Sequence, residues 1–367
     1  KNANGAGYPF TLRRSAGMDV DIAAPAGGLG AVTGMHRMGA DLYVAYGTKI
    51  YVHDLTDILP AVLLGTSAYS GNVPVRMASN GVTVVSISMD TNKLYTFSRA
   101  TGAIALNAFT ANLGSITYQD GYMIGVSRDN QKFYISAIDD ATSWAAGATF
   151  SEADSSPDGL LGGISAGRLL YLFGNDTIEI WENTGNAAFP FERSAIGTTN
   201  IGIAREGQGS ICADGAHVYF IGDDRFVYAA VGAGLERISN EYVENRIRDQ
   251  DLLNCSAFIA KDVGRRELRI NTPNITVAYD MLHGTWSERK SDGELRARPQ
   301  YLVENKGAGS PNAEVSNLVS DFEGSAIYAL SDVSTDEAGT VMLAEIITPP
   351  VYAGGRPIFF DEFMLEV

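Results

Sequence analysis

The sequence predicts an all-β protein, a β-propeller of six or seven blades, with a further β domain beginning near the C-terminus. Three observations favour this fold: aromatic-rich β runs recur along the chain, Gly, Asn and Asp fill the turns between them, and helical patterns are almost absent. The segment 42–52 is typical, because Gly47-Thr48-Lys49 separate two apolar runs. Hairpin turns of two to four residues require residues of this kind.

The hairpins repeat at the spacing of propeller blades, roughly every 40–60 residues. They occupy residues 42–52, 82–97, 122–135, 169–181, 218–228 and 267–279, and residues 327–330 open a weaker seventh. Weaker strands precede them, for example at 75–78 and 115–118, so four strands are available for each blade. A β-sandwich array is the alternative, but it would give turn signals every 8–12 residues without the longer period. Closing the blades into a ring leaves only short, protected sheet edges.

The composition supports a large folded body. The chain has 367 residues, 45% of them hydrophobic and 19% charged, which is enough apolar material for a large core and too little charge for disorder. We expect residues 1–30 to close the propeller or lead into it, residues 31–340 to form its body, and residues 341–367 to begin a C-terminal β segment or tip domain. Because the chain ends in an apolar run, we expect more chain to follow. No run of 18 apolar residues occurs, so we expect no membrane span.

One segment, 238–253, has a helical pattern. Ser239 is its candidate N-cap, and Val243 and Ile247 form an apolar i, i+4 series. The segment predicts a surface helix or a loop between sheets.

The net charge of −16 argues against tight binding to nucleic acid. Proteins that hold DNA gain affinity by neutralising phosphates with Lys and Arg. A surface this acidic suits a conduit along which DNA slides, and it equally suits plain solubility.

No catalytic or metal-binding constellation is visible. The histidines are His36, His53, His217 and His283, and none forms an HxH, HExxH or HxxxH motif. His36 and His53 lie near the first hairpin, so a shared ligand role and separate turn positions both stay open. Cys212 and Cys255 form no CxxC motif and no disulfide framework, and we expect two buried apolar thiols. We predict no enzyme and no cofactor.

The remaining charged and glycine-rich stretches have two interpretations each. Residues 28–34 are glycine-rich, but no helix pattern follows them, as a dinucleotide site needs. The acidic loops 152–158 and 332–337 match no calcium-loop spacing and are predicted to be solvated loops. Arg265, Arg266 and the basic residues of 289–298 form either a contact patch for an acidic neighbour or DNA, or ordinary loop charges.

Residues 169–193 (LLYLFGNDTIEIWENTGNAAFPFER) resemble the signature segment of phage packaged DNA stabilisation proteins, the tail accessory, hub or nozzle proteins of short-tailed phages. An ordered set of flanking motifs extends the resemblance over about residues 139–289, while the stretch 205–208 departs from it. The residues that carry the resemblance, as structural residues of the family motifs, are Trp181, Thr184, Gly185, Pro190, Phe191, Arg193, Gly222, Asp224, Trp286 and Arg289. Arg193 is expected to anchor either a loop or a contact between subunits.

The resemblance implies a virion tail component that is assembled in the host cytoplasm. Several copies, expected to be six, would form a ring below the portal or adaptor protein, extend the DNA channel and retain the packaged genome. A tail needle, plug or fibres would dock below, and DNA would pass through the lumen without tight binding. The alternatives are a propeller-type enzyme that degrades polysaccharide and a host-surface binding module.

Overall fold

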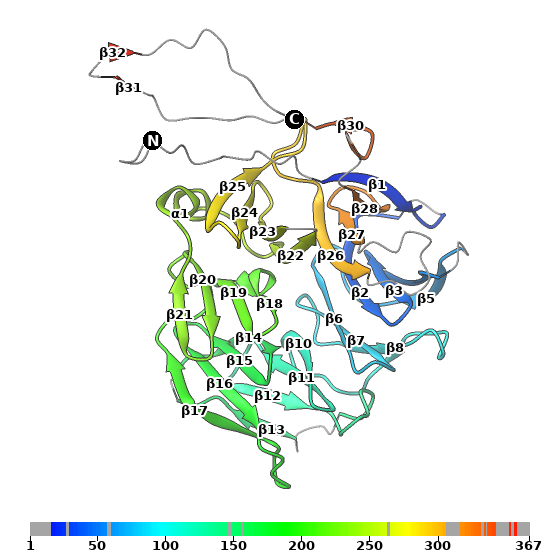
Figure 1. The fold of residues 1–367 in the computed structure, drawn as a ribbon. Coiled ribbons are helices and arrows are strands. Elements are labelled where there is room, and N and C mark those ends of the chain that lie inside the picture. The colour runs from blue at the N-terminus through cyan, green and yellow to red at the C-terminus, as the bar shows by residue number, and fades with distance from the viewer. Residues whose placement is uncertain are drawn as a thin grey trace.

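The structure, a computed structural model, describes most of the chain between residues 16 and 342. Within that range it leaves out 27–28, 57–59, 145–148, 156, 263–264, 306–315, 332–333 and 335, and beyond it describes 352–353 and 356–357. The described residues form seven radially arranged antiparallel blades around a central axis (Figure 1). The prediction of a β-propeller is therefore confirmed, and the blade number is seven.

The first three blades follow one another along the chain, each with its strands in sequence order. They are β2 (Val32–Met38), β3 (Asp41–Tyr46), β4 (Lys49–Asp54) and β5 (Val62–Thr66); β6 (Val75–Ser79), β7 (Val84–Ser88), β8 (Leu94–Phe97) and β9 (Ala105–Leu106); and β10 (Leu113–Gln119), β11 (Tyr122–Ser127), β12 (Lys132–Ile135) and β13 (Phe150–Glu152). Neighbouring blades contact each other through their first strands, which therefore surround the axis.

Blades 4 to 6 repeat the same order. They are β14 (Leu160–Ala166), β15 (Leu169–Gly174), β16 (Ile178–Asn183) and β17 (Phe191–Thr199); β18 (Cys212–Asp214), β19 (His217–Ile221), β20 (Val227–Val231) and β21 (Gly234–Arg237); and β22 (Ser256–Asp262), β23 (Arg265–Asn271), β24 (Thr276–Asp280) and β25 (Thr285–Arg289). A 3-10 turn, η1 (Gly207–Ser210), precedes blade 5.

Blade 7 closes the ring with strands from both ends of the chain. It contains β26 (Pro299–Asn305), β27 (Ser316–Asp321), β28 (Ile327–Ser331) and β1 (Gly17–Ile22), and β29 (Asp336–Glu337) and β30 (Thr340–Val341) extend the same sheet. β1 runs antiparallel to β28 (Figure 1). The expectation that residues 327–330 open a seventh hairpin is wrong, because β28 closes a hairpin that β27 opens and its other neighbour is the N-terminal strand β1. A two-stranded hairpin, β31 (Tyr352–Ala353) with β32 (Arg356–Pro357), follows.

Alternation along the strands distributes the core among the junctions between blades. In β15, Leu170 and Leu172 pack toward blade 3, whereas Tyr171 and Phe173 pack toward blade 5. Successive side chains of a strand point to opposite faces, so each blade fills two junctions. Buried apolar clusters of this kind join each successive pair from blade 1 to blade 6, and blade 7 to blade 1.

The predicted helix is shorter than expected and begins one residue later. α1 spans Glu241–Ile247, and Val243 and Ile247 are buried as the pattern predicts. The N-cap is Asn240, whose side chain accepts a hydrogen bond from the Val243 amide. Ser239 is not the cap, because its hydroxyl donates to Glu244 Oε1 and accepts from the Val227 amide.

Candidate functional site

The segment 169–193 forms most of blade 4, and its aromatic residues Trp181 and Phe191 face blade 3. Trp181 is 5% exposed and packs edge-on against Phe133 of β12, with ring centroids 4.9 Å apart. Phe191, at the start of β17, contacts the same ring at 6.5 Å. Ile178 and Ile180 lie on the other face, toward blade 5. The segment thus packs blade 4 against both neighbours.

Glu179 organises the polar part of this segment. Its side chain is 3% exposed, and Oε2 accepts hydrogen bonds from Trp181 Nε1 and Arg193 Nε, both at 3.0 Å. Oε1 accepts from the amide and the hydroxyl of Ser155, at 2.8 and 2.6 Å. A buried carboxylate needs such partners because an unpaired one would be costly. Sequence reasoning missed Glu179, although a lone Glu between two isoleucines of a strand was a usable signal.

Arg193 anchors a loop within the chain. Besides Glu179, its guanidinium contacts Asp154, with Nη2 and Oδ1 2.5 Å apart, and lies 5.7 Å from the centre of the Trp181 ring. Asp154 and Ser155 belong to the connection between β13 and β14. We call Asp154, Ser155, Glu179, Trp181 and Arg193 the Glu179 cluster; it ties that connection to the outer strands of blade 4.

Thr184, Gly185 and Pro190 shape the turn between β16 and β17. The Thr184 amide donates to the Pro190 carbonyl at 2.8 Å, and the Gly185 amide donates to Asn183 Oδ1 at 2.9 Å. Gly185 has φ of +70°, a conformation that glycine adopts without steric cost. These three residues therefore set the conformation of the loop.

Gly222 and Asp224 form a turn of blade 5, between its second and third strands, β19 and β20. Asp224 accepts from the Phe226 amide at 3.0 Å and from the Tyr228 hydroxyl at 2.6 Å. A Cβ on Gly222 would lie 2.7 Å from the Tyr228 ring, so the turn needs glycine there.

Trp286 and Arg289 lie on β25 of blade 6 and make contacts within the chain. Trp286 donates to the Ile238 carbonyl at 2.7 Å, and Arg289 Nη2 lies 2.5 Å from Oε1 of the buried Glu267. Arg269 Nε contacts Oε2 of the same carboxylate at 2.8 Å. Burial alone would raise the pKa of Glu267, but the two guanidiniums lower it to about 2.

The structure brings Trp181, Phe191 and Arg193 together but leaves the blade 5 and blade 6 residues in their own blades. The ten predicted residues therefore form no single site. Each of them takes part in a turn, in packing or in an internal ion pair.

The arginines of the basic stretches form ion pairs and hydrogen bonds with other residues of the chain. Arg266 pairs with Asp214 at 2.6 Å, and Arg298 pairs with the buried Asp321 at 2.7 Å. Arg296 is buried and donates to the Thr272 carbonyl at 3.1 Å, and burial lowers its pKa to about 10. These arginines consequently hold loops and blades in place and do not form an open basic patch.

His36 and His53 have separate partners. His36 Nε2 lies 2.9 Å from Ser79 Oγ of blade 2, and His53 Nε2 lies 3.3 Å from the Tyr46 hydroxyl. Burial lowers the pKa of each imidazole to about 4, so both are neutral at pH 7. Over the part of the chain that the structure describes, no three His, Cys, Asp or Glu side chains are grouped as a metal site would require.

Both cysteines are free thiols. Cys255 is buried and Cys212 is half-buried, and burial raises the pKa of the Cys255 thiol to about 12. These thiols are therefore protonated and poorly nucleophilic at neutral pH.

The acidic loop 152–158 also has internal roles. Asp158 Oδ2 accepts from the amides of Asp176 and Thr177, at 2.9 and 3.0 Å, and so holds the turn before β16. In the second acidic loop, residues 332, 333 and 335 lie outside the described residues.

The stretch 205–208 leads into the centre of the ring. Arg76, on the first strand of blade 2, donates from Nη1 to the Gln208 carbonyl of η1 at 3.2 Å. η1 contacts β14, β19 and β22, so this hydrogen bond joins opposite sides of the ring. A Cβ on Gly209 would lie 1.9 Å from the Cys255 carbonyl oxygen, which explains the glycine. The axis of the single propeller is therefore bridged at this level.

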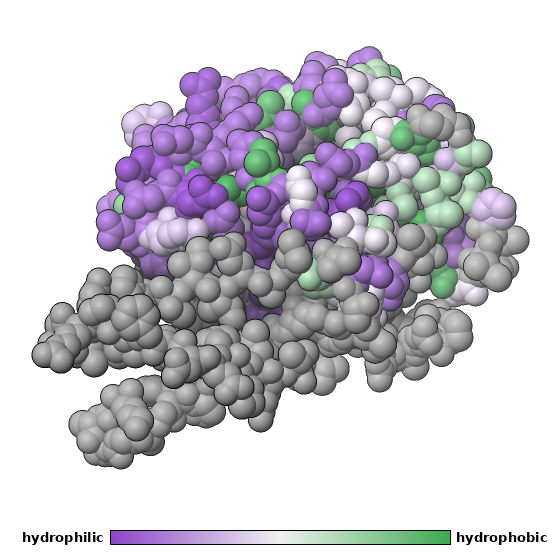
Figure 2. Space-filling view, turned by 90° about the horizontal axis from the view of Figure 1, so that it is seen from above, coloured by the Kyte–Doolittle hydropathy of each residue, from purple (hydrophilic) through white to green (hydrophobic). Residues whose placement is uncertain are grey.

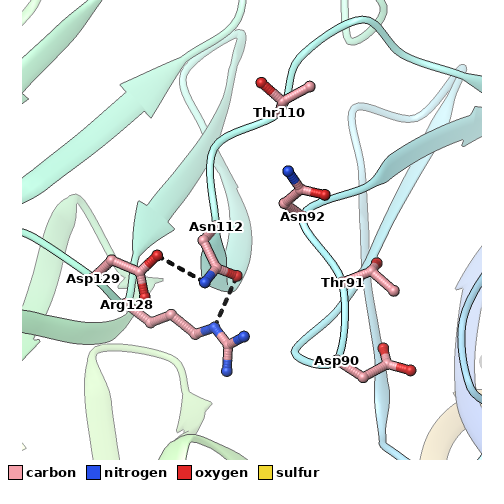
Figure 3. A pocket seen from close by; sticks show the side chains of 7 residues that line it. All are labelled: Asp90, Thr91, Asn92, Thr110, Asn112, Arg128 and Asp129. Carbon is pink, nitrogen blue, oxygen red and sulfur yellow. Dashed lines mark hydrogen bonds between the residues drawn. The ribbon is translucent and has the colours of Figure 1, made fainter.

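Several open hollows lie on the surface of the described residues, two of them beside blade 3. One, of 470 Å³, lies between loops of blades 2 and 3 and is lined by Asp90, Thr91, Asn92, Thr110, Asn112, Arg128 and Asp129 (Figure 3). There Asn112 bonds both Arg128 and Asp129, so the side chains on one wall are already paired. The other, of 640 Å³, lies beside the Glu179 cluster, and its lining includes Phe150, Phe189 and Glu192.

No helix of the described residues is long and apolar enough to cross a membrane.

Together, these features define a seven-bladed β-propeller in which the distinctive residues pack blades, shape turns and pair buried charges. Comparison with protein families identifies which propeller this is. The model of the phage stabilisation family, described as the bacteriophage P22 Gp10 β-propeller, matches residues 22–304. The chain belongs to this family and is a bacteriophage structural protein. No curated protein sequence matches it.

Solved structures share the fold at low sequence identity. The extracellular domain of the hybrid two-component system BT4673 from B. thetaiotaomicron has a TM-score of 0.56 at 9% identity, over 86% of this chain and 39% of that one. Streptogramin B lyase has a TM-score of 0.54 at 11% identity, over 85% and 97%. A chain of the mitotic checkpoint complex has a TM-score of 0.51 at 11% identity, over 90% and 98%. At such identities the likeness concerns the propeller alone.

Proposed function

We propose that this chain forms a hub or nozzle ring in the tail of a short-tailed phage, where it extends the DNA channel and helps to retain the packaged genome. Family membership over residues 22–304 carries the proposal. The internal use of the distinctive residues supports a structural role, because Glu179, Glu267 and Arg298 are all engaged in buried contacts within the chain.

In this proposal DNA runs through a lumen between copies. The hydrogen bond from Arg76 to Gln208 bridges the axis of each propeller, so a single copy offers no conduit there. A ring, proposed to contain six copies, would surround the lumen below the portal or adaptor, with a needle, plug or fibres beneath it. The charge of −16 per copy would repel phosphate and keep DNA from binding tightly to the wall.

A deletion in the phage tests this function. Particles produced without the chain should package DNA and then lose it, so their DNA content should fall after packaging and free DNA should become sensitive to nuclease. Supplying the wild-type chain should restore retention. Particles that keep their DNA and infect normally without the chain would contradict the proposal.

A polysaccharide-degrading enzyme predicts a different outcome. Purified full-length chain would then depolymerise host surface polysaccharide in the absence of any tail protein. The likeness to streptogramin B lyase, at 11% identity, shows only a shared fold and gives no support to that activity.

A further inference from the structure

Three exposed apolar side chains belong to turns on one face of blades 2 and 3. Val82, Tyr118 and Ile138 are 72%, 37% and 60% exposed. Val82 lies in the turn between β6 and β7, Tyr118 lies near the end of β10, and Ile138 lies in the connection between β12 and β13. On the side of α1, by contrast, hydrophilic residues dominate the surface (Figure 2). Clustered apolar side chains on a surface indicate a binding site, whereas single ones need no explanation.

Hydrogen bonds hold these turns side by side. Asn80 Nδ2 donates to the Asp139 carbonyl at 3.3 Å and so joins the turn between β6 and β7 to the connection after β12. The Asp139 amide donates to the Gly121 carbonyl at 2.8 Å, and the Gly121 amide donates to the Tyr118 hydroxyl at 3.2 Å. A Cβ on Gly121 would lie 3.0 Å from Ile138 Cγ1. Tyr118 and Ile138 therefore border the same glycine.

The side chains also share a direction. Ile116 packs in the apolar junction between blades 2 and 3, and alternate residues of a strand point to the same face, so Tyr118 also points toward blade 2. The connection after β12 covers the same junction, because Ala141 and Trp144 belong to its buried cluster. The exposed apolar side chains thus lie at one end of this junction.

Three exposed carboxylates, those of Asp120, Asp139 and Asp140, adjoin the apolar side chains. We call these three residues, together with Val82, Tyr118 and Ile138, the blade 2–3 patch. The segments that contain the patch and its surroundings have no Lys or Arg over residues 77–92, 100–127 and 133–167. The negative charge is therefore a local property of this surface.

One arginine borders the patch on its far side. The carbonyl of Arg168, in the first turn of blade 4, accepts from Gln119 Nε2 at 2.9 Å. Even with this arginine, the three carboxylates leave the surroundings negative. Asp140 stays ionised at neutral pH, because hydrogen bonds from the hydroxyl and the amide of Thr142 lower its pKa.

The backbone of the patch is set before any partner arrives. Asp120 and Asp139 have φ of +49° and +56°, in the left-handed region that Asp adopts more readily than most residues. The hydrogen bonds of Asp139 to Gly121 and Asn80 fix the two turns in this conformation. A surface that is already ordered loses little conformational freedom on binding.

The local charge favours a basic polypeptide as the occupant. Carboxylates repel the phosphates of nucleic acid and of acidic lipids, whereas they attract Lys and Arg and steer a basic protein to the surface. The basic stretches 265–266 and 289–298 of this chain are engaged in internal ion pairs. These features favour another protein over a second copy of this chain.

We propose that the blade 2–3 patch binds a segment of another protein in which Lys or Arg flanks an apolar side chain. The apolar side chains of the patch bury the apolar group of the partner, and the carboxylates pair with its cations. The inference rests on the proposed function in one respect, because it takes the partner to be another protein of the virion.

Site-specific cross-linking in particles tests the occupant. With Val82 replaced by the photo-reactive amino acid p-benzoylphenylalanine, illumination should join the chain to one other virion protein, and mass spectrometry should map the product to a segment with Lys or Arg beside an apolar residue. The same replacement at Leu282, which is 70% exposed on blade 6, is the control and should not give this product. Cross-links from position 82 only to a second copy or to DNA, or no product at all, would overturn the proposal.

Neutral substitutions test the role of charge. In particles with the cross-linker at position 82, the combined change Asp120→Asn, Asp139→Asn and Asp140→Asn should lower the yield of the product about tenfold or more. Asn adopts the same left-handed conformation and keeps an acceptor for Thr142, so the turns should retain their structure. Thermal unfolding of the purified variant checks that the propeller folds.

A matched triple variant removes the same charge elsewhere. Asp176, Asp249 and Asp292 are exposed and lie outside the patch, and their combined replacement by Asn should leave the yield within about twofold. Equal losses from the two triple variants would overturn recognition by the patch carboxylates. Particles that contain the chain but give no product at position 82 contradict only this inference, whereas particles without the chain contradict the proposed function itself.

Discussion

Blades 3 and 4 meet through aromatic rings, whereas blades 6 and 7 meet through buried polar groups. At the first junction Phe133 packs against Trp181 at 4.9 Å. At the second, the buried Asn271 donates to the Pro299 carbonyl at 2.9 Å, and Ser256 donates to the Gln300 carbonyl at 2.6 Å. The same radial geometry is thus stabilised by two kinds of interaction.

The difference determines how each junction responds to change. Apolar packing is lost when volume is removed and does not depend directly on pH. Buried polar groups need every partner, since an unpaired donor or carboxylate costs more than the bond contributes. The stability of blade 6 therefore depends on Glu267 staying ionised, and the stability of blade 4 depends on the volume of the Trp181 side chain.

Replacing Trp181 should have the largest effect. Trp181→Ala removes the packing on Phe133 and should lower the free energy of unfolding by about 3–5 kcal/mol. Trp181→Phe should retain most of the packing and cost about 1–2 kcal/mol, because it loses the hydrogen bond to Glu179. Chemical denaturation measures both. An unchanged unfolding midpoint for Trp181→Ala would show that the aromatic junction contributes little.

Acid should weaken blade 6 through Glu267. Its pKa falls from 4.5 to about 2 on folding, so its contribution is present above pH 4.5 and is lost as the pH falls toward 2. The size of that contribution is roughly 3 kcal/mol. Unfolding free energies measured from pH 7 to pH 2 should therefore fall more steeply for wild type than for Glu267→Gln, which lacks this titration. Parallel curves for the two proteins would contradict the assignment.

Asn271 tests the polar junction without changing charge. Asn271→Ala leaves the Pro299 carbonyl without its donor and removes the acceptor of the Thr276 hydroxyl, so we expect a loss of about 1–3 kcal/mol. Asn274→Ala, in the exposed turn of the same hairpin, is the control and should change stability by less than about 0.5 kcal/mol. If both substitutions lowered the free energy of unfolding equally, the buried hydrogen bonds of Asn271 would not be what stabilises the junction between blades 6 and 7.

Arg193 should show the smallest effect of the set. Its side chain is 35% exposed, and Glu179 keeps its three donors from Trp181 and Ser155. Arg193→Met should therefore cost only about 1 kcal/mol, with faster hydrogen exchange at the Ser155 amide. A loss as large as that of Trp181→Ala would mean that the ion pair, and not the ring packing, holds blade 4.

The fold was largely predictable from the sequence because its signal is local and repeated. Alternating aromatic runs with glycine and asparagine turns specify the hairpins at Gly47 and Gly185, and the period specifies the propeller. The sequence offered ring closure as one of two roles for residues 1–30, but it did not identify the partner strand. The pairing of β1 with β28 joins residues more than 300 positions apart, and neither strand has a pattern that specifies the other.

The candidate site was predictable only in part. The motif located Trp181 and Arg193, yet it did not reveal Glu179, because a carboxylate in a strand gives no sign of which donors surround it. For the basic stretch near Arg296 and Arg298 the sequence left a contact patch and ordinary loop charges both open, because Asp321, which neutralises Arg298, lies more than 20 positions further along the chain. Such pairings depend on how the strands pair in three dimensions.

Imaging intact particles tests the central claim most directly. Averaged density of the tail should show the propeller in a closed ring around the tail axis, proposed to be sixfold, with DNA in the lumen between copies. Density that places single propellers on fibres or on the capsid surface, with no ring on the axis, would contradict the account.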